Sequence, residues 1–207
     1  MQRNRGARLF PLFLTLVIII VLIIGIVSLG KAIFGGGQSR PESPTVDTGR
    51  QSLLDTSAGR SVRLTVRGPI VASENFTTYT ITASPATRAM IVYKGYVDDK
   101  ISNSKSLANN KQSYEQFVYA LDKANMMIGT EDSSKNDVRG ICATGYVYDY
   151  AVLNDNSIVK HLWTSTCSGS PGTLKASVGQ LNNLFLDQIP GSRDMNPFSQ
   201  GPTLGEY

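Results

Sequence analysis

The chain is poor in the residues from which most catalytic and metal sites are built. It has one histidine, His161, and two cysteines, Cys142 and Cys167, in 207 residues. A zinc site with several histidines is therefore excluded, and the motifs HExxH and GxSxG are absent. We expect His161 to be a structural strand residue. The sequence indicates no cofactor, no metal ligand and no catalytic residue.

Acidic residues are missing from residues 1–41, and this region carries a long uncharged run. Leu9 to Leu29 contain no charge, and basic residues precede them at Arg3, Arg5 and Arg8. A helix over residues 9–29 is about 31 Å long, which matches a hydrocarbon core of about 30 Å. The positive-inside rule places residues 1–8 in the cytoplasm and the remainder of the chain outside. We therefore expect a single-pass anchor in the lipid bilayer of the cell membrane.

A cleaved signal peptide is the alternative to this signal-anchor. Gly30-Lys31-Ala32 places small residues at the spacing that a signal peptidase accepts. Cleavage after Ala32 would make the protein secreted. The apolar part of a signal peptide is usually about 7–15 residues, which favours the retained anchor for this longer run.

The net charge of +4 does not indicate nucleic-acid binding. Four of the 20 basic residues flank the apolar run, and the other 16 are balanced by the 16 acidic residues. No basic run occurs in the exported part, so a surface that follows a phosphate backbone is not expected.

The region after the anchor divides into a linker, one domain and a tail. Residues 30–59 are rich in Gly, Ser, Pro, Thr and Gln, which predicts a flexible linker. Residues 60–190 are long enough for one domain with its own core. Residues 191–207 are polar and predict a loose C-terminal tail.

Hydrophobic periodicity predicts an α+β domain for residues 60–190. Apolar and polar residues alternate over 62–67 and 78–83, and a returning strand is expected over 89–96. A polar loop is expected over 98–110. Ser113 and Gln116 form a capping-box pattern before one helix, and a second apolar stripe runs from Leu174 to Phe185. With two more strands in between, we expect an antiparallel sheet of about five strands with two helices packed on one face.

Those two strands, 146–153 and 158–167, predict a hairpin around Asn154-Asp155-Asn156. A two-residue loop at Asn154-Asp155 would bring four pairs opposite one another: Asp149 and Lys160, Tyr148 and His161, Tyr146 and Trp163, Cys142 and Cys167. Outside the cytoplasm disulfides persist, so we predict a Cys142–Cys167 disulfide. Two buried free thiols are the alternative.

The hairpin also carries the only candidate binding surface, an aromatic stripe of Tyr146, Tyr148, Tyr150 and Trp163. Such residues often form binding surfaces for sugars or proteins. The alternative is that they are the buried face of the sheet, which is favoured because Asp149 and Lys160 occupy the opposite face.

These patterns favour a non-enzymatic binding module of the cell envelope, with a protein or glycan partner. A hydrolase of wall polymer or peptide is an alternative, as is an accessory subunit of an envelope complex. A deep cleft lined by Asp, Glu, Ser or His161 would favour the enzyme, and a flat exposed aromatic face would favour binding.

Overall fold

The computed structural model describes residues 48–96, 100–130 and 136–199 of the chain. The predicted membrane helix over 9–29 lies outside these residues, as do residues 30–47. Within the part that is described, no helix is both long and apolar enough to cross a membrane.

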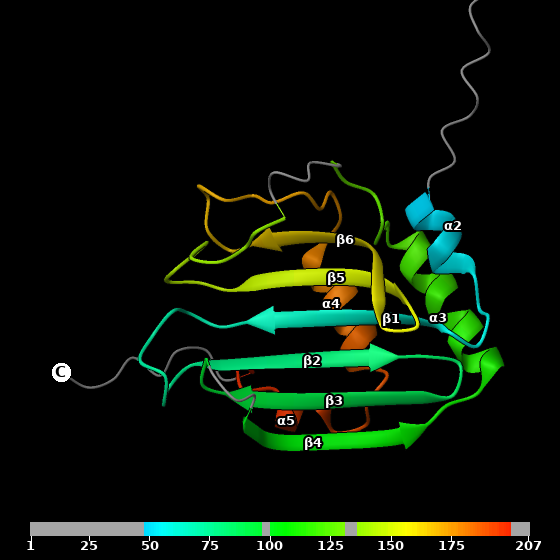
Figure 1. Cartoon of the computed structure of the whole chain (residues 1–207), viewed down its shortest axis with the longest axis horizontal. Coiled ribbons are helices and arrows are strands. Elements are labelled where there is room, and N and C mark those ends of the chain that lie inside the picture. The colour runs from blue at the N-terminus through cyan, green and yellow to red at the C-terminus, as the bar shows by residue number, and fades with distance from the viewer. Residues whose placement is uncertain (1–47, 97–99, 131–135, 200–207) are drawn as a thin grey trace, which may run out of the picture. The chain divides into compact units, whose positions relative to one another are not determined.

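Six antiparallel strands form one sheet in the order β4-β3-β2-β1-β5-β6 (Figure 1). The strands are β1 (Arg60–Arg67), β2 (Thr77–Ala83), β3 (Thr87–Lys94), β4 (Lys100–Ala108), β5 (Val147–Asn154) and β6 (Ser157–Ser165). The predicted α+β class is confirmed, but the sheet has one strand more than the five expected. The extra strand is β4, which falls in the predicted loop over 98–110. Its side chains are mostly exposed because it is an edge strand, so it carries no apolar alternation.

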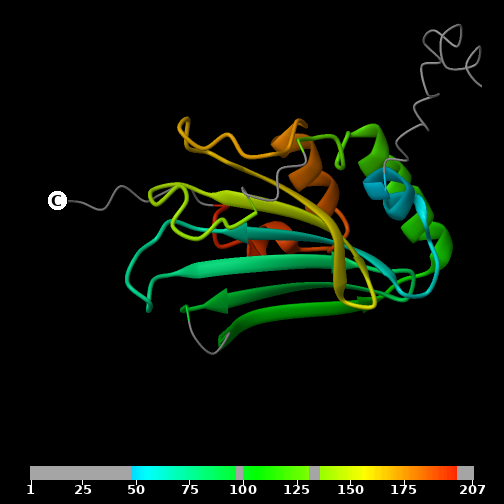
Figure 2. The ribbon, with the colours of Figure 1, turned by 45° about the horizontal axis from the view of Figure 1, so that its top comes forward.

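One face of this sheet forms the core together with the helices. Val62, Leu64 and Val66 of β1 are at most 1% exposed. They share one hydrophobic cluster with residues of α3 (Lys111–Lys123) and α4 (Val178–Leu186). Phe117 of α3 meets Phe185 of α4 edge to face, with ring centroids 5.2 Å apart. In Figures 1 and 2, α4 lies behind the sheet, and α3 lies at one end of it.

Both helices begin at capping residues that differ from the predicted start. The side chain of Asn110 accepts a hydrogen bond from the Ser113 amide at 2.9 Å, so α3 begins one turn before the predicted capping box. Ser177 caps α4. Leu174, which was expected inside that helix, lies before it in an isolated bridge with Gly129 and is 8% exposed.

The folded part extends beyond the predicted domain at both ends. Helix α2 (Thr48–Leu54) lies in the predicted linker, and its Leu53 is 1% exposed. Helix α5 (Ser192–Met195) and Phe198 lie in the predicted tail, where the Phe198 ring packs 5.8 Å from that of Tyr79. A few apolar side chains attach each segment to the domain. The surrounding residues are mostly polar, so the composition of the segment does not reveal this attachment.

The β5–β6 hairpin forms with a different turn from the one expected. Asp155 and Asn156 are the loop, with φ of 46° and 69°, as a type I′ turn requires. A bulge follows, so Tyr148 pairs with Thr164 and Asp149 with Trp163. The predicted register is therefore wrong. The actual pairing differs by an odd number of residues, which places Trp163 and the tyrosines on opposite faces.

Candidate functional site

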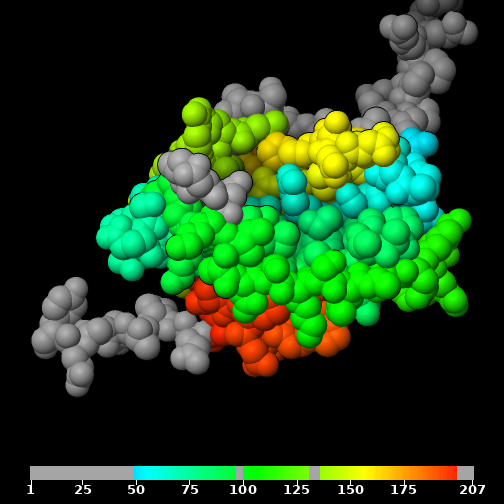
Figure 3. Space-filling view, turned by 60° about the horizontal axis from the view of Figure 1, so that its bottom comes forward, coloured from blue at the N-terminus to red at the C-terminus, as the bar shows by residue number. Residues whose placement is uncertain are grey.

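We call the face of the sheet away from the helices the open face (Figure 1). It is polar over β1 and β2, and on β5 and β6 it also carries the buried side chains of Val147, Ala151 and Trp163. Register places 11 of its side chains by alternation: Arg63, Thr65, Arg67, Thr78, Thr80, Thr82, Ala89, Ile91, Tyr93, Asp149 and His161. Nearly all of them are half-buried. Seen obliquely from the β4 edge, the strands form a broad surface, with the red and orange helices lying beneath it (Figure 3).

Asp149 and His161 form a hydrogen-bonded pair on this open face. The Nδ1 atom of His161 lies 2.9 Å from Oδ2 of Asp149, and the two side chains are 19% and 20% exposed. The hydrogen bond in which the Asp149 carboxylate is the acceptor raises the pKa of His161, against the opposing effects of burial and of the positive charge on Arg63. The carboxylate thereby fixes the orientation of the ring. In the described ranges, the hydrogen bond of the His161 side chain is the one with Asp149, and no hydroxyl or thiol is bonded to the ring.

Two arginines of β1 lie on the same face as this pair. The Nε atoms of Arg63 and Arg67 are both buried without a hydrogen-bond partner in the described part of the chain. An Nη atom of Arg67 donates to the carbonyl oxygen of Ile141. Arg63 lies between Thr82 on β2 and Ala151 on β5. Because both of these neighbours are small, the guanidinium of Arg63 is the largest polar group among the side chains paired across the sheet at this position.

The predicted disulfide is confirmed, although the register used to derive it is not. Cys142 and Cys167 are bonded, with Cα atoms 5.4 Å apart. Both lie beyond the last strand pair, Val147 with Ser165. Cys142 has a positive φ of 53° in the preceding loop. The disulfide joins residues 136–146 to residues 166–172 beside a second small apolar cluster that contains Val147 and Trp163.

Gly145 lies inside this disulfide-linked corner. A Cβ atom there would lie 2.3 Å from the Thr166 hydroxyl and 2.7 Å from the sulfur of Cys142. The loop therefore needs a residue without a side chain at this position.

The predicted aromatic stripe does not form one surface. Tyr150 is fully buried, with its ring 6.0 Å from that of Phe185. Tyr148 packs partly buried against the same core, and the ring of Tyr146 lies 4.9 Å from that of Phe198. Trp163 is 3% exposed in the cluster beside the disulfide. The structure thus places Tyr150 and Trp163 in two separate parts of the interior.

Four of the eight large apolar side chains that are exposed in the described part of the chain lie at the end of the sheet that holds the disulfide. We call Ile70, Val71, Tyr96 and Ile101 the loop-end patch; they are 39%, 43%, 47% and 55% exposed. The Tyr96 hydroxyl accepts from the Val71 amide at 3.0 Å and donates to its carbonyl at 2.8 Å. The Tyr96 ring stacks on Phe76 at 3.9 Å. The only sequence signal for this patch is the apolar pair Ile70-Val71 after Pro69, between two strands.

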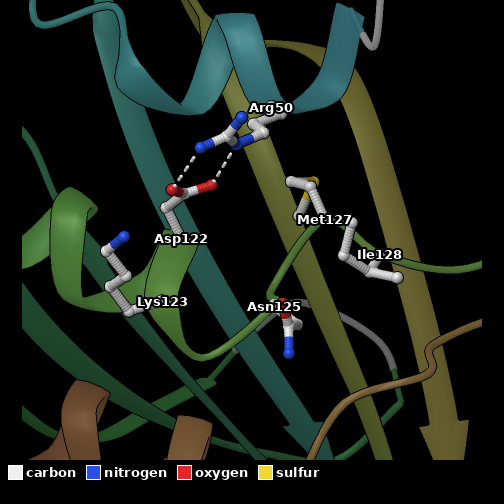
Figure 4. A pocket seen from close by; sticks show the side chains of 6 residues that line it. All are labelled: Arg50, Asp122, Lys123, Asn125, Met127 and Ile128. Atoms are coloured by element: carbon white, nitrogen blue, oxygen red, sulfur yellow. Dashed lines mark hydrogen bonds and ion pairs between the residues drawn. The ribbon is translucent and has the colours of Figure 1, made fainter.

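A pocket of about 330 Å³ lies where α2 meets the end of α3 (Figure 4). Arg50 and Asp122 point toward each other across it and form two hydrogen bonds of 2.6 and 2.9 Å. The guanidinium there is neutralised by the carboxylate, so this contact joins the two helices. A second pocket, of about 370 Å³, is lined by Ile141, Trp163 and Pro171. His161 lines neither pocket.

The residues described contain no group of three or more His, Cys, Asp or Glu side chains that could hold a metal ion. No protein-family model matches the chain, and no curated protein or solved structure matches it either. The loop-end patch and the open face are the two surfaces of the described domain that bear on function.

Proposed function

We propose that the protein is a non-enzymatic binding module, held on a single-pass membrane anchor and displayed in the cell envelope. Its partner is an envelope protein or glycan, bound through the loop-end patch and the adjoining open face. The observation that carries the proposal is the patch itself, four large apolar side chains at least 39% exposed at one end of the sheet.

Contacts within the loop-end patch hold the Tyr96 side chain in one orientation. Tyr96 is held by two hydrogen bonds to Val71 and by its stack on Phe76. Side chains fixed in this way lose little conformational entropy when a partner binds. Tyrosine is also enriched in the centres of interfaces, where its ring and hydroxyl both make contacts.

The patch and the point where the chain enters the described domain lie at opposite ends of the sheet. The chain enters the described domain through α2, at the end of the sheet opposite to the loops that carry Val71 and Tyr96 (Figure 1). An accessory subunit of an envelope complex would use the same surface against a fixed neighbour.

The test is site-specific photo-crosslinking in the native envelope. A photoreactive residue replaces Val71 or Tyr96, and a matched control replaces Val159, which is 42% exposed near the other end of the sheet. We expect a discrete adduct from the two patch positions and none from Val159. Equal adducts from all three positions, or none from any, would contradict the proposal.

A hydrolase is the second candidate, and the Asp149–His161 hydrogen bond is the observation that favours it. An oriented imidazole can transfer protons, but a reaction needs a nucleophile or water held beside it. The measurement is release of fragments from wall polymer and from unfolded peptide by the full chain. Hydrolysis that is lost in His161→Gln would support the enzyme, and hydrolysis that persists would exclude this pair as its site.

A further inference from the structure

The charges of the open face do not balance one another. Among the described residues of this face, the arginines are Arg63 and Arg67, and the only carboxylate is Asp149. Asp149 is engaged with His161 at 2.9 Å. Arg63 has no ion pair in the described part of the chain, and its Nε atom is buried without a partner. A half-buried guanidinium forms its strongest contacts with a carboxylate or a phosphate.

The two arginines lie on β1, in the middle of the sheet, where side chains on one face repeat at every second residue. Arg63, Thr65 and Arg67 are successive residues on one face of β1. At about 3.4 Å per residue, the Cα atoms of the two arginines are roughly 13–14 Å apart. Threonines lie directly opposite all three on β2, and their hydroxyl groups can donate to an oxyanion.

We infer that the open face binds an extended peptide segment of the partner with two acidic side chains four residues apart. One carboxylate contacts Arg63, and the other contacts Arg67. This inference rests on the proposed function and gives the chemistry of the partner. An extended chain lying along β1 repeats its same-face side chains every second residue, about 7 Å, which is the spacing of Arg63, Thr65 and Arg67.

The same face disfavours a continuous polyanion. Asp149 lies directly opposite Thr65, between the two arginines in the direction of the strand. Its negative charge repels a polymer that carries a phosphate at every position. Two separate carboxylates, with uncharged side chains over Thr65, avoid that repulsion. Polyanion binding also depends on a broad positive field, which one carboxylate and two arginines do not provide.

The test measures binding of a labelled peptide, acetyl-Glu-Thr-Val-Thr-Glu-amide, to the full chain in detergent by fluorescence anisotropy. A matched peptide with glutamine in place of both glutamates is the ligand control. We expect Arg63→Gln and Arg67→Gln each to weaken binding of the acidic peptide about tenfold, as the loss of one charged hydrogen-bonded pair implies. Lys94→Gln, which removes an exposed charge on the covered side of the sheet, is expected to leave binding unchanged.

Arg63→Lys separates a specific contact from damage to the fold. It keeps the charge and most of the stem but loses the planar fork, so we expect a several-fold loss of affinity with unchanged thermal unfolding. Equal binding of the acidic and glutamine peptides would overturn the inference. So would an equal loss in Lys94→Gln, or tighter binding of inorganic polyphosphate through the same arginines. If these peptides fail while crosslinking from Val71 persists, the inference fails and the proposed binding module stands.

Discussion

The two faces of the sheet are built from the same strands, but one face forms the apolar core and the other carries polar side chains. On β1, Val62, Leu64 and Val66 are at most 1% exposed beneath the helices. The residues between them, Arg63 and Thr65 among them, are half-buried on the open face. Aliphatic contacts on the covered face supply most of the stability, whereas the open face carries the hydrogen-bonding groups. Substitutions on the two faces should therefore separate stability from binding.

Among the described residues, the loops joined by the disulfide cover one corner of the open face. The apolar cluster there has three buried members, Cys142, Val147 and Trp163. The main core has many more, contributed by the sheet and by the helices. So small a cluster buries too little apolar surface to hold two loops by itself. The disulfide supplies the constraint that packing supplies on the covered face.

The largest effect is expected for truncation in the covered face. Phe185 is fully buried, and Phe185→Ala should lower the free energy of unfolding by about 3–5 kcal/mol. Ile91→Ala, on the half-buried open face, should cost less than about 1.5 kcal/mol because its site is already partly open to solvent. Urea denaturation followed by circular dichroism measures both. Equal losses for the two variants would show that something covers the open face in solution.

Removal of the disulfide should have the next largest effect. A bridge that closes a loop of 25 residues stabilises by about 3 kcal/mol through the entropy of the unfolded chain. The double variant Cys142→Ser/Cys167→Ser should therefore lose about that much stability in urea denaturation. Reductant should destabilise the natural chain by a similar amount and leave the double variant unchanged. A double variant as stable as the natural chain would show that the corner holds without the bond.

The sequence predicted the covered face better than the open one, for a physical reason. Burial imposes apolar alternation, so β1, β2 and both long helices are visible in the sequence. Edge strand β4 has no buried side, and its residues resemble a polar loop. Helix α2 docks with Leu53 as its fully buried residue, which a window average cannot detect.

The candidate site was predicted only in part, because register depends on one turn. The disulfide was predicted from a register that proved wrong and also from the number of cysteines and the expected compartment, which do not depend on register. Asn154-Asp155-Asn156 allows two loops of two residues, and positive φ at Asp155 and Asn156 selects the second. That turn, together with the bulge that follows it between Val152 and Leu153, pairs Asp149 with Trp163 and brings its carboxylate to His161. The Asp149–His161 pair could therefore not be predicted from the sequence pattern alone.

The smallest expected effect is the contribution of the Asp149–His161 pair to stability. The direction of its pH dependence follows from the raised pKa of His161. The hydrogen bond with Asp149 raises that pKa in the folded chain above its ordinary value of about 6.5. The protonated pair therefore stabilises the fold fully below about pH 6.5, and the contribution is lost as the pH rises through the raised pKa.

Asp149→Asn should accordingly destabilise the chain more at pH 5.5 than at pH 8.5. A titration of the His161 ring followed by NMR should give a lower pKa in the variant, because burial and the charge of Arg63 both act against protonation. Arg63→Gln should raise the pKa of His161 instead. A His161 pKa below 6.5 in the natural chain would contradict the hydrogen bond. An unchanged pKa in Arg63→Gln would place the guanidinium too far away to act on the same part of the open face.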